Sequence, residues 1–188
     1  MAMQNSKSLY LCFFFCFLFL VLMHSTECKK KKTLKPCMNL KFYYHDILYN
    51  GSNVQNATSV LIAKPAATAN FSLLFGYMVV FDDVITLDSN LHSPSVGRAQ
   101  GLYAYNGKNI LGAWFGFTII LNSTDYKGSL TIAGADYPLQ DKHRYFAVVG
   151  GTGDFFMSRG ICTITTDEVE GMAYFRLLMN ITLYECYT

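Results

Sequence analysis

The chain has 188 residues and a formal net charge of +2; hydrophobic residues make up 52% of it and aromatic residues 15%. Much of the basic excess lies in one lysine run at residues 29–32, so the sequence offers no basic face for nucleic acid. Only 15% of the residues are charged, whereas folded domains average roughly 25%. We therefore expect part of the apolar and aromatic surplus to line a cavity or an interface.

The N-terminus has the pattern of a secretory leader. Residues 9–23 are almost wholly apolar and follow a single Lys7. At roughly 15 residues this run is short for a membrane-spanning helix and matches the h-region of a signal peptide, with a signal anchor as the alternative. We expect a signal peptide over residues 1–27, a basic segment over 28–38 and one β domain over 39–188, in a secreted protein.

Four cysteines lie outside the apolar leader run. Cys37 precedes the first expected strand and Cys186 ends the last, so a bridge between them would tie both ends of the domain into the fold. Cys162 lies in an alternating apolar run and is expected to be a buried free thiol, and the state of Cys28 stays open. With no Cys-x-x-Cys spacing and no histidine cluster, we expect no metal site.

Glycosylation motifs are dense for a chain of this length. Asn-x-Ser/Thr sequons occur at Asn50, Asn56, Asn70, Asn122 and Asn180. The first four are candidate glycosylation sites, with Asn56 and Asn122 near expected loops. Asn180 lies inside the last strand pattern and is expected to be unmodified.

From residue 40 onward the chain reads as short β segments rich in β-branched and aromatic residues. The expected strands are 40–48, 59–62, 77–81, 97–105, 113–121, 128–133, 144–149, 161–165 and 173–184. Turn signals such as Asn106-Gly107 and the glycine-rich 150–154 separate them. No helical periodicity occurs outside the leader, so we expect an all-β sandwich or closed barrel with antiparallel neighbours. Segment 113–121 is apolar on both faces, which predicts a homo-oligomer.

Two acids are candidates for chemistry. If Phe42, Tyr44 and Asp46 face inward, burial raises the pKa of the Asp46 carboxyl and makes it a proton donor; a solvated, outward Asp46 is the alternative. His45 then faces the other way and forms no dyad with it. Asp136 supplies a second acid and Arg144 opens the strand that returns from the same loop, although a plain loop aspartate and a surface arginine fit the pattern equally well.

Other catalytic motifs find no support. The glycine-rich segment 150–154 lacks the Lys-Ser/Thr of a phosphate loop and precedes strand-like sequence, so a hairpin turn is favoured. No Gly-x-Ser-x-Gly elbow occurs. The aromatic runs 102–105 and 174–177 are ordinary core in most proteins, but in a barrel with a cavity their inward members become stacking surfaces for aromatic guests.

Several longer segments resemble dirigent proteins, in the same order along the chain. They are 42–49, 56–59, 80–83, 91–101, 148–157 and 174–177. The resemblance runs from about residue 37 to residue 187, essentially the whole chain after the leader. Its nearest subgroup directs coniferyl alcohol radicals to pinoresinol.

The resemblance implies an eight-stranded antiparallel β-barrel of the calycin or allene oxide cyclase-like kind. It implies a trimer, with a dimer as the alternative, acting in the apoplast of a plant cell wall. A separate laccase or peroxidase generates the phenoxy radicals, and the barrel, without a cofactor, metal or redox centre, fixes the 8–8′ coupling geometry. The product is optically active pinoresinol, in the phenylpropanoid pathway to lignans.

The resemblance also implies roles for individual residues. Asp46 and Asp136 match proton donors to quinone-methide oxygens, and Cys37 and Cys186 match a terminal disulfide. The residues that match ring-binding positions are Tyr103, Tyr105, Arg144 and Phe175. Two rival functions remain: a dirigent-like cyclase that closes a pterocarpan-type ring on a quinone methide, and a lipocalin-like carrier of aromatic ligands.

Overall fold

A computed structural model describes residues 34–66, 73–139 and 142–187. The expected signal peptide, Cys28, the lysine run and the sequon at Asn70 lie outside the described residues. Among those that are described, no helix has the length and apolar character needed to cross a membrane. The strands of the described chain are β1 (Met38–Ile47), β2 (Ser59–Ala63), β3 (Met78–Thr86), β4 (Gly97–Tyr105), β5 (Ala113–Asn122), β6 (Lys127–Asp136), β7 (Arg144–Gly153), β8 (Arg159–Glu170) and β9 (Tyr174–Glu185).

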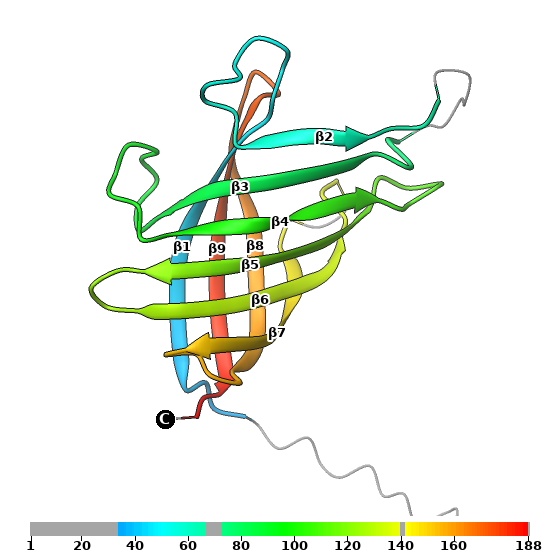
Figure 1. Cartoon of the computed structure of the whole chain (residues 1–188). Helices are drawn as coiled ribbons and strands as arrows, with labels where there is room; N and C mark the ends of the chain where they lie inside the picture. Colours follow the sequence, from blue (N-terminus) through cyan, green and yellow to red (C-terminus); the bar gives the residue numbers. More distant parts are fainter. Residues whose placement is uncertain (1–33, 67–72, 140–141, 188) are drawn as a thin grey trace, which may run out of the picture. The chain divides into compact units, whose positions relative to one another are not determined.

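Eight of these strands close a barrel. The hydrogen-bonded order is β1-β9-β8-β7-β6-β5-β4-β3, every pair is antiparallel, and β1 pairs with β3 to complete the circle. The short β2 is an additional strand on β3. Figure 1 shows β1, β9 and β8 crossing behind the wrapped strands β3 to β7. The all-β, eight-stranded antiparallel barrel expected from the sequence is confirmed, and closure leaves few strand edges open to other chains.

Strand β3 has two partners along its length. Its C-terminal half pairs with β1, through Tyr44 opposite Ile85 and His45 opposite Val84. Its N-terminal half pairs with β2, where Ser59 lies opposite Phe81. The barrel therefore has a seam where β1 leaves β3 and β2 takes its place, directly after the row of His45 and Val84.

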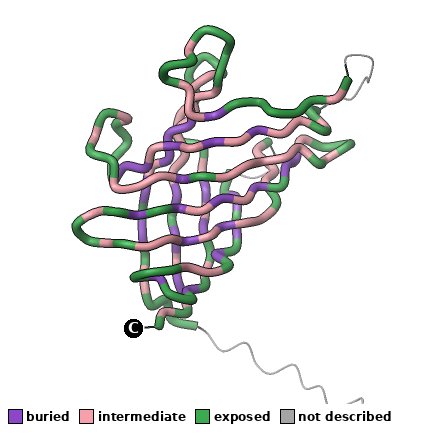
Figure 2. Tube along the Cα trace, viewed as in Figure 1, coloured by how far each residue is buried: buried purple, intermediate pink, exposed green. Residues whose placement is uncertain are grey.

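Side chains alternate between the barrel interior and the outer surface, as strand geometry requires. In β5, Phe115, Phe117 and Ile119 are buried, whereas Trp114 and Ile120 are exposed. Figure 2 shows buried positions separated by intermediate or exposed ones along much of the barrel wall. Cys162 is fully buried and unpaired, which confirms its prediction as a buried free thiol.

Two strand boundaries differ from the sequence-based expectation. The expected strand 77–81 continues to Thr86, because Asp82 and Asp83 occupy the two faces of a regular strand instead of ending it. The expected turn at 150–154 is mostly strand, since β7 pairs with β6 as far as Gly153. Glycine permits this path: a Cβ on Gly151 would lie 2.4 Å from the Phe155 carbonyl oxygen, and Gly153 has a φ of 60°.

The disulfide joins Cys37 to Cys186, across a sequence separation of 149 residues. Because the bond closes such a long loop in the unfolded chain, replacing both cysteines by serine should lower the free energy of unfolding by about 2–5 kcal/mol. Denaturant titration of the variant and of the parent protein would measure the difference. The same comparison in a thiol reductant is the control: the parent should then lose the advantage, and an advantage that persists would contradict the assignment.

Candidate functional site

The predicted ring-binding residues and acids gather at one end of the barrel. The strand register places Tyr105, Ala113 and Asp136 opposite one another across β4, β5 and β6. Tyr103 lies two residues before Tyr105 on β4 and therefore on the same face. Phe175 lies opposite Asp46 on β9. Tyr103, Tyr105 and Phe175 occupy inward positions yet are partly exposed, whereas inward residues at the other end, such as Leu183 and Leu130, are fully buried. We call this end of the barrel, where the inward aromatic residues Tyr103, Tyr105 and Phe175 are partly exposed, the barrel mouth.

Asp46 faces the interior. Its residue is only 6% exposed, and the Ser59 hydroxyl at the start of β2 donates a hydrogen bond to its carboxyl oxygen. Burial raises the pKa of Asp46 to about 6, and the Ser59 hydrogen bond opposes that rise. The outward alternative is thus excluded, and Asp46 retains its proton in mildly acidic solution.

Asp136 lies at the end of β6 in a different environment. The Nε of Arg144, at the start of β7, is 3.5 Å from its Oδ1. Arg144 is buried and also donates a hydrogen bond of 3.0 Å to Thr166 Oγ1. Burial raises the pKa of Asp136, and the charge of Arg144 opposes the rise. The structure therefore brings Asp136 and Arg144 together inside the mouth, in place of the surface positions that the sequence also allowed.

Tyrosine rings form the wall between the two acids. Tyr103 packs against Tyr105 at a centroid distance of 5.7 Å and against Phe115, also at 5.7 Å. Burial, followed by the charge of Asp46, raises the pKa of the Tyr103 phenol; burial and the charge of Asp136 do the same for Tyr105. Both hydroxyls stay protonated near neutral pH, so this wall offers ring faces for stacking and hydroxyls for hydrogen bonding.

A third interior acid was missed by the sequence-based assignment. Asp83 is fully buried; the Tyr44 and Thr58 side chains lie near enough to lower its pKa, but neither of its oxygens has a partner in good hydrogen-bond geometry among the described residues. Burial, followed by the charge of Asp46, raises its pKa to about 8. The alternation Val79, Phe81, Asp83, Ile85 carries the signal for its inward position, once β3 is extended beyond residue 81.

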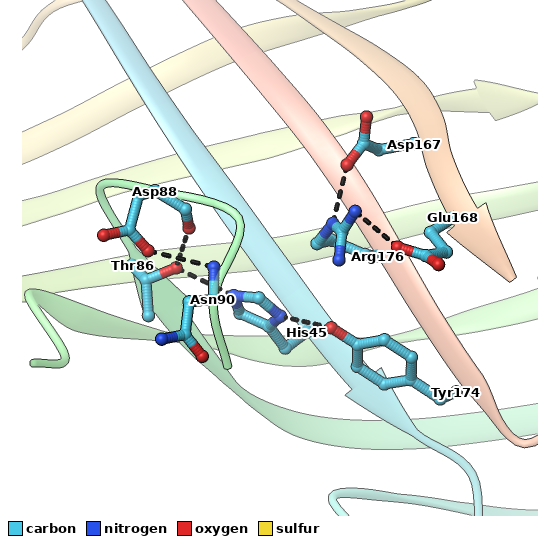
Figure 3. A network of polar contacts seen from close by, with 8 residues as sticks. All are labelled: His45, Thr86, Asp88, Asn90, Asp167, Glu168, Tyr174 and Arg176. Carbon is cyan, nitrogen blue, oxygen red and sulfur yellow. Dashed lines mark hydrogen bonds and ion pairs between the residues drawn. The ribbon is translucent and has the colours of Figure 1, made fainter. Parts of the chain in front are cut away.

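His45 belongs to a separate network on the outer face (Figure 3). Its Nε2 is 2.7 Å from Thr86 Oγ1, and its Nδ1 is 2.8 Å from the Tyr174 hydroxyl. Because Thr86 gives its own hydroxyl proton to the Asp88 carbonyl, its oxygen accepts from Nε2–H, and Tyr174 donates to Nδ1. Burial and the nearby Arg176 lower the pKa of His45, consistent with a neutral ring. As predicted, it forms no dyad with Asp46.

Two clefts among the described residues are lined by none of the predicted site residues. One, of about 460 Å³, lies over the seam and is lined in part by Tyr49, Val60 and Phe81. The other, of about 350 Å³, lies beside the His45 network. We place the site in the barrel mouth because the acids and the inward rings converge there. Among the glycosylation candidates, Asn50, Asn56 and Asn122 are exposed.

Comparison with known proteins agrees with this geometry. A family model described as dirigent-like protein matches residues 37–184. Dirigent protein 5 of Arabidopsis thaliana is 50% identical over 178 residues, covering 93% of this chain and 96% of that protein. A dirigent protein of Sinopodophyllum hexandrum is 49% identical over 183 residues, covering 95% and 94% of the two chains.

Solved structures give the same result. A pterocarpan synthase dirigent protein superposes with a TM-score of 0.70 at 26% identity, covering 80% of this chain and 90% of that chain. A second pterocarpan synthase dirigent protein has the same score and identity and is covered to 96%. The family model spans most of the chain, two relatives are about half identical to it, and the barrel is shared: this protein belongs to the dirigent family.

Proposed function

We propose that this protein directs the 8–8′ coupling of two coniferyl alcohol phenoxy radicals, made by a separate laccase or peroxidase, toward optically active pinoresinol. The observation that carries the proposal is the convergence of Asp46 and Asp136 on an aromatic mouth inside a closed barrel. Family membership supports it.

The chemistry asks little of the protein beyond orientation and a proton. Coupling of two radicals has almost no barrier, so the barrel need only fix which faces meet. The coupled intermediate is a quinone methide. It cyclises when its quinone-methide oxygen takes up a proton and a hydroxyl group of the same intermediate attacks the carbon attached to the aromatic ring. Asp46 and Asp136 donate such protons, and the attacking hydroxyl releases one in return, so the step consumes no protons overall. Arg144 holds the Asp136 carboxyl in place.

The proposal includes the setting in which the protein acts. The leader over residues 1–27 and the exposed sequons at Asn50, Asn56 and Asn122 support secretion into the apoplast and glycosylation. Exposed apolar side chains on the outer faces of β5 and β7, among them Trp114, Ile120 and Tyr145, support a homo-oligomer, which we propose to be a trimer.

The direct test supplies coniferyl alcohol and an oxidase with and without the folded protein, and resolves the pinoresinol by chiral chromatography. We expect one enantiomer to be enriched in proportion to the protein added, up to saturation. Oxidase alone should give a racemic mixture of coupling products. A racemic mixture at an excess of folded protein would contradict the proposal.

A second candidate is a cyclase that acts on a closed-shell quinone methide. The similarity to two pterocarpan synthase dirigent proteins favours it, because the same interior acids would protonate such an intermediate. A cyclase would convert its substrate without any oxidase, whereas a coupling director yields nothing until radicals are supplied. Tight binding of aromatic ligands with neither effect would instead indicate a carrier.

A further inference from the structure

Asp83 is an acid without an assigned task. A carboxyl group buried without hydrogen bonds costs several kcal/mol if it is ionised and still a substantial amount if it is neutral. Asp83 is fully buried on the inner face of β3, where the Thr58 and Tyr44 side chains lower its pKa only in part and neither carboxyl oxygen has a partner in good hydrogen-bond geometry within the described chain. An isosteric apolar residue at this position would avoid that cost, so its presence calls for a reason.

The seam places Asp83 beside Asp46. The register of β1 and β3 ends with His45 opposite Val84, and Asp46 and Asp83 are the next residues on the two strands. Both side chains face inward. Beyond this row the strands diverge around the start of β2, where Ser59 bonds to Asp46 and the Asp82 amide donates to the Thr58 carbonyl.

The groups around Asp83 make it the weaker acid of the two. From β1 it faces the buried Tyr44 hydroxyl and Asp46. From β4, Tyr103 lies on the same inner side, and the charges of both acids raise the pKa of its phenol. Arg98 of β4 is the cationic member of this group. Its guanidinium, however, pairs on the outer face with Asp82, at 2.5 Å. The neighbours of the Asp83 carboxyl on the inner side are therefore hydroxyls and a second acid.

We propose that Asp83 and Asp46 act as one carboxyl pair, in which Asp83 is a positioning residue that keeps a proton available to Asp46. This inference rests on the proposed function. With one proton on the pair, Asp83–H passes that proton to the Asp46 carboxylate, and Asp46 gives it to the quinone-methide oxygen. The proton released by the attacking hydroxyl returns to the pair, so bonds and charges balance over the cycle.

The carboxyl pair sets the pH above which the site can no longer donate a proton. The pKa of Asp46 is about 6 and that of Asp83, raised further by the Asp46 charge, is about 8, so the pair holds one proton between these values. In both the parent and Asp83→Asn, Asp46 loses its proton beside a neutral neighbour. In the parent a proton is still held by Asp83, whereas asparagine holds none that can be transferred. The acid function should then fail above about pH 6 in place of about pH 8.

The experiment compares the yield of directed product, above the racemic background, for three proteins from pH 5 to pH 8.5. Asp83→Asn should equal the parent at pH 5 and fall about tenfold or more below it at pH 7.5. Asp82→Asn is the matched control, because it makes the same change one residue away on the outer face, and should follow the parent. A profile of Asp83→Asn that superposes on that of the parent would overturn the pair.

A second measurement needs neither substrate nor a variant. Infrared difference spectra of the parent protein, with ¹³C-labelled aspartate, should show a protonated carboxyl that persists from pH 6 to pH 8; loss of the band by pH 6 would overturn the proposal even if Asp83→Asn failed to fold. If the band persists but the parent directs no coupling at any pH, the proposed function fails and the carboxyl pair stands. If the parent directs coupling but shows no such band, the proposed function stands and the carboxyl pair fails.

Discussion

Asp46→Asn should yield far less pinoresinol of the favoured enantiomer than the parent protein does. Asparagine preserves the size of the side chain and, like the protonated acid, is neutral, so the barrel should stay folded and still admit aromatic guests. It has no carboxylic proton to give, and loss of a positioned general acid costs about 10²–10⁴-fold in rate. Coupled intermediates that leave the barrel uncyclised are open to attack by water, so the yield of the directed product falls.

Asp136→Asn should lower the yield of directed product to a similar extent, because the second quinone-methide oxygen then lacks its proton donor. In this variant Arg144 also loses its carboxylate partner at 3.5 Å and keeps its hydrogen bond to Thr166. Chiral chromatography of the coupling product, at equal concentrations of folded protein judged by circular dichroism, measures both effects. Asp125→Asn, in the exposed turn between β5 and β6, is the control and should direct coupling as the parent does. A yield of the favoured enantiomer from Asp46→Asn equal to that of the parent would show that this acid is not needed.

The sequence predicted the strands because alternation is a local property, whereas the choice of an eight-stranded barrel over a sandwich came from the resemblance to dirigent proteins. The period of two along 40–48 put Asp46 on the same face as Phe42 and Tyr44, and burial of both aromatics confirms that face. The position of Cys37 before the first strand and of Cys186 after the last likewise singled out the pair that forms the disulfide.

Asp83 could not be assigned in the same way. The expected strand ended at residue 81, before Asp82 and Asp83, and aspartate is depleted from strands. What keeps the strand regular is non-local: Arg98 of β4 pairs with Asp82 outside, and β1 and β2 cover Asp83 inside. The pairing of Asp136 with Arg144 was similarly open, since it depends on the path of the chain between β6 and β7.

Asp83→Asn should be more stable than the parent protein in neutral and weakly alkaline solution. In the unfolded chain the carboxyl ionises near its ordinary pKa of 3.8, whereas in the folded barrel it holds its proton to about pH 8. The folded state therefore binds more protons between these values, so the parent loses stability as pH rises from 4 to 8 and gains it as pH falls. The loss reaches on the order of 5 kcal/mol at pH 8, and the asparagine variant is free of it.

Guanidinium unfolding at pH 4, 6 and 8, with the disulfide intact, measures this difference. The stability curves of the two proteins should lie close together at pH 4 and separate progressively toward pH 8. Asp82→Asn, whose side chain is half exposed and paired with Arg98, should not gain stability at any of these values. Parallel curves for Asp83→Asn and the parent would mean that the folded and unfolded states release this proton at the same pH, which would contradict the rise in pKa that burial of this carboxyl predicts. A gain in stability together with a loss of directed coupling at pH 7.5 would identify Asp83 as a residue retained for function at the expense of the fold.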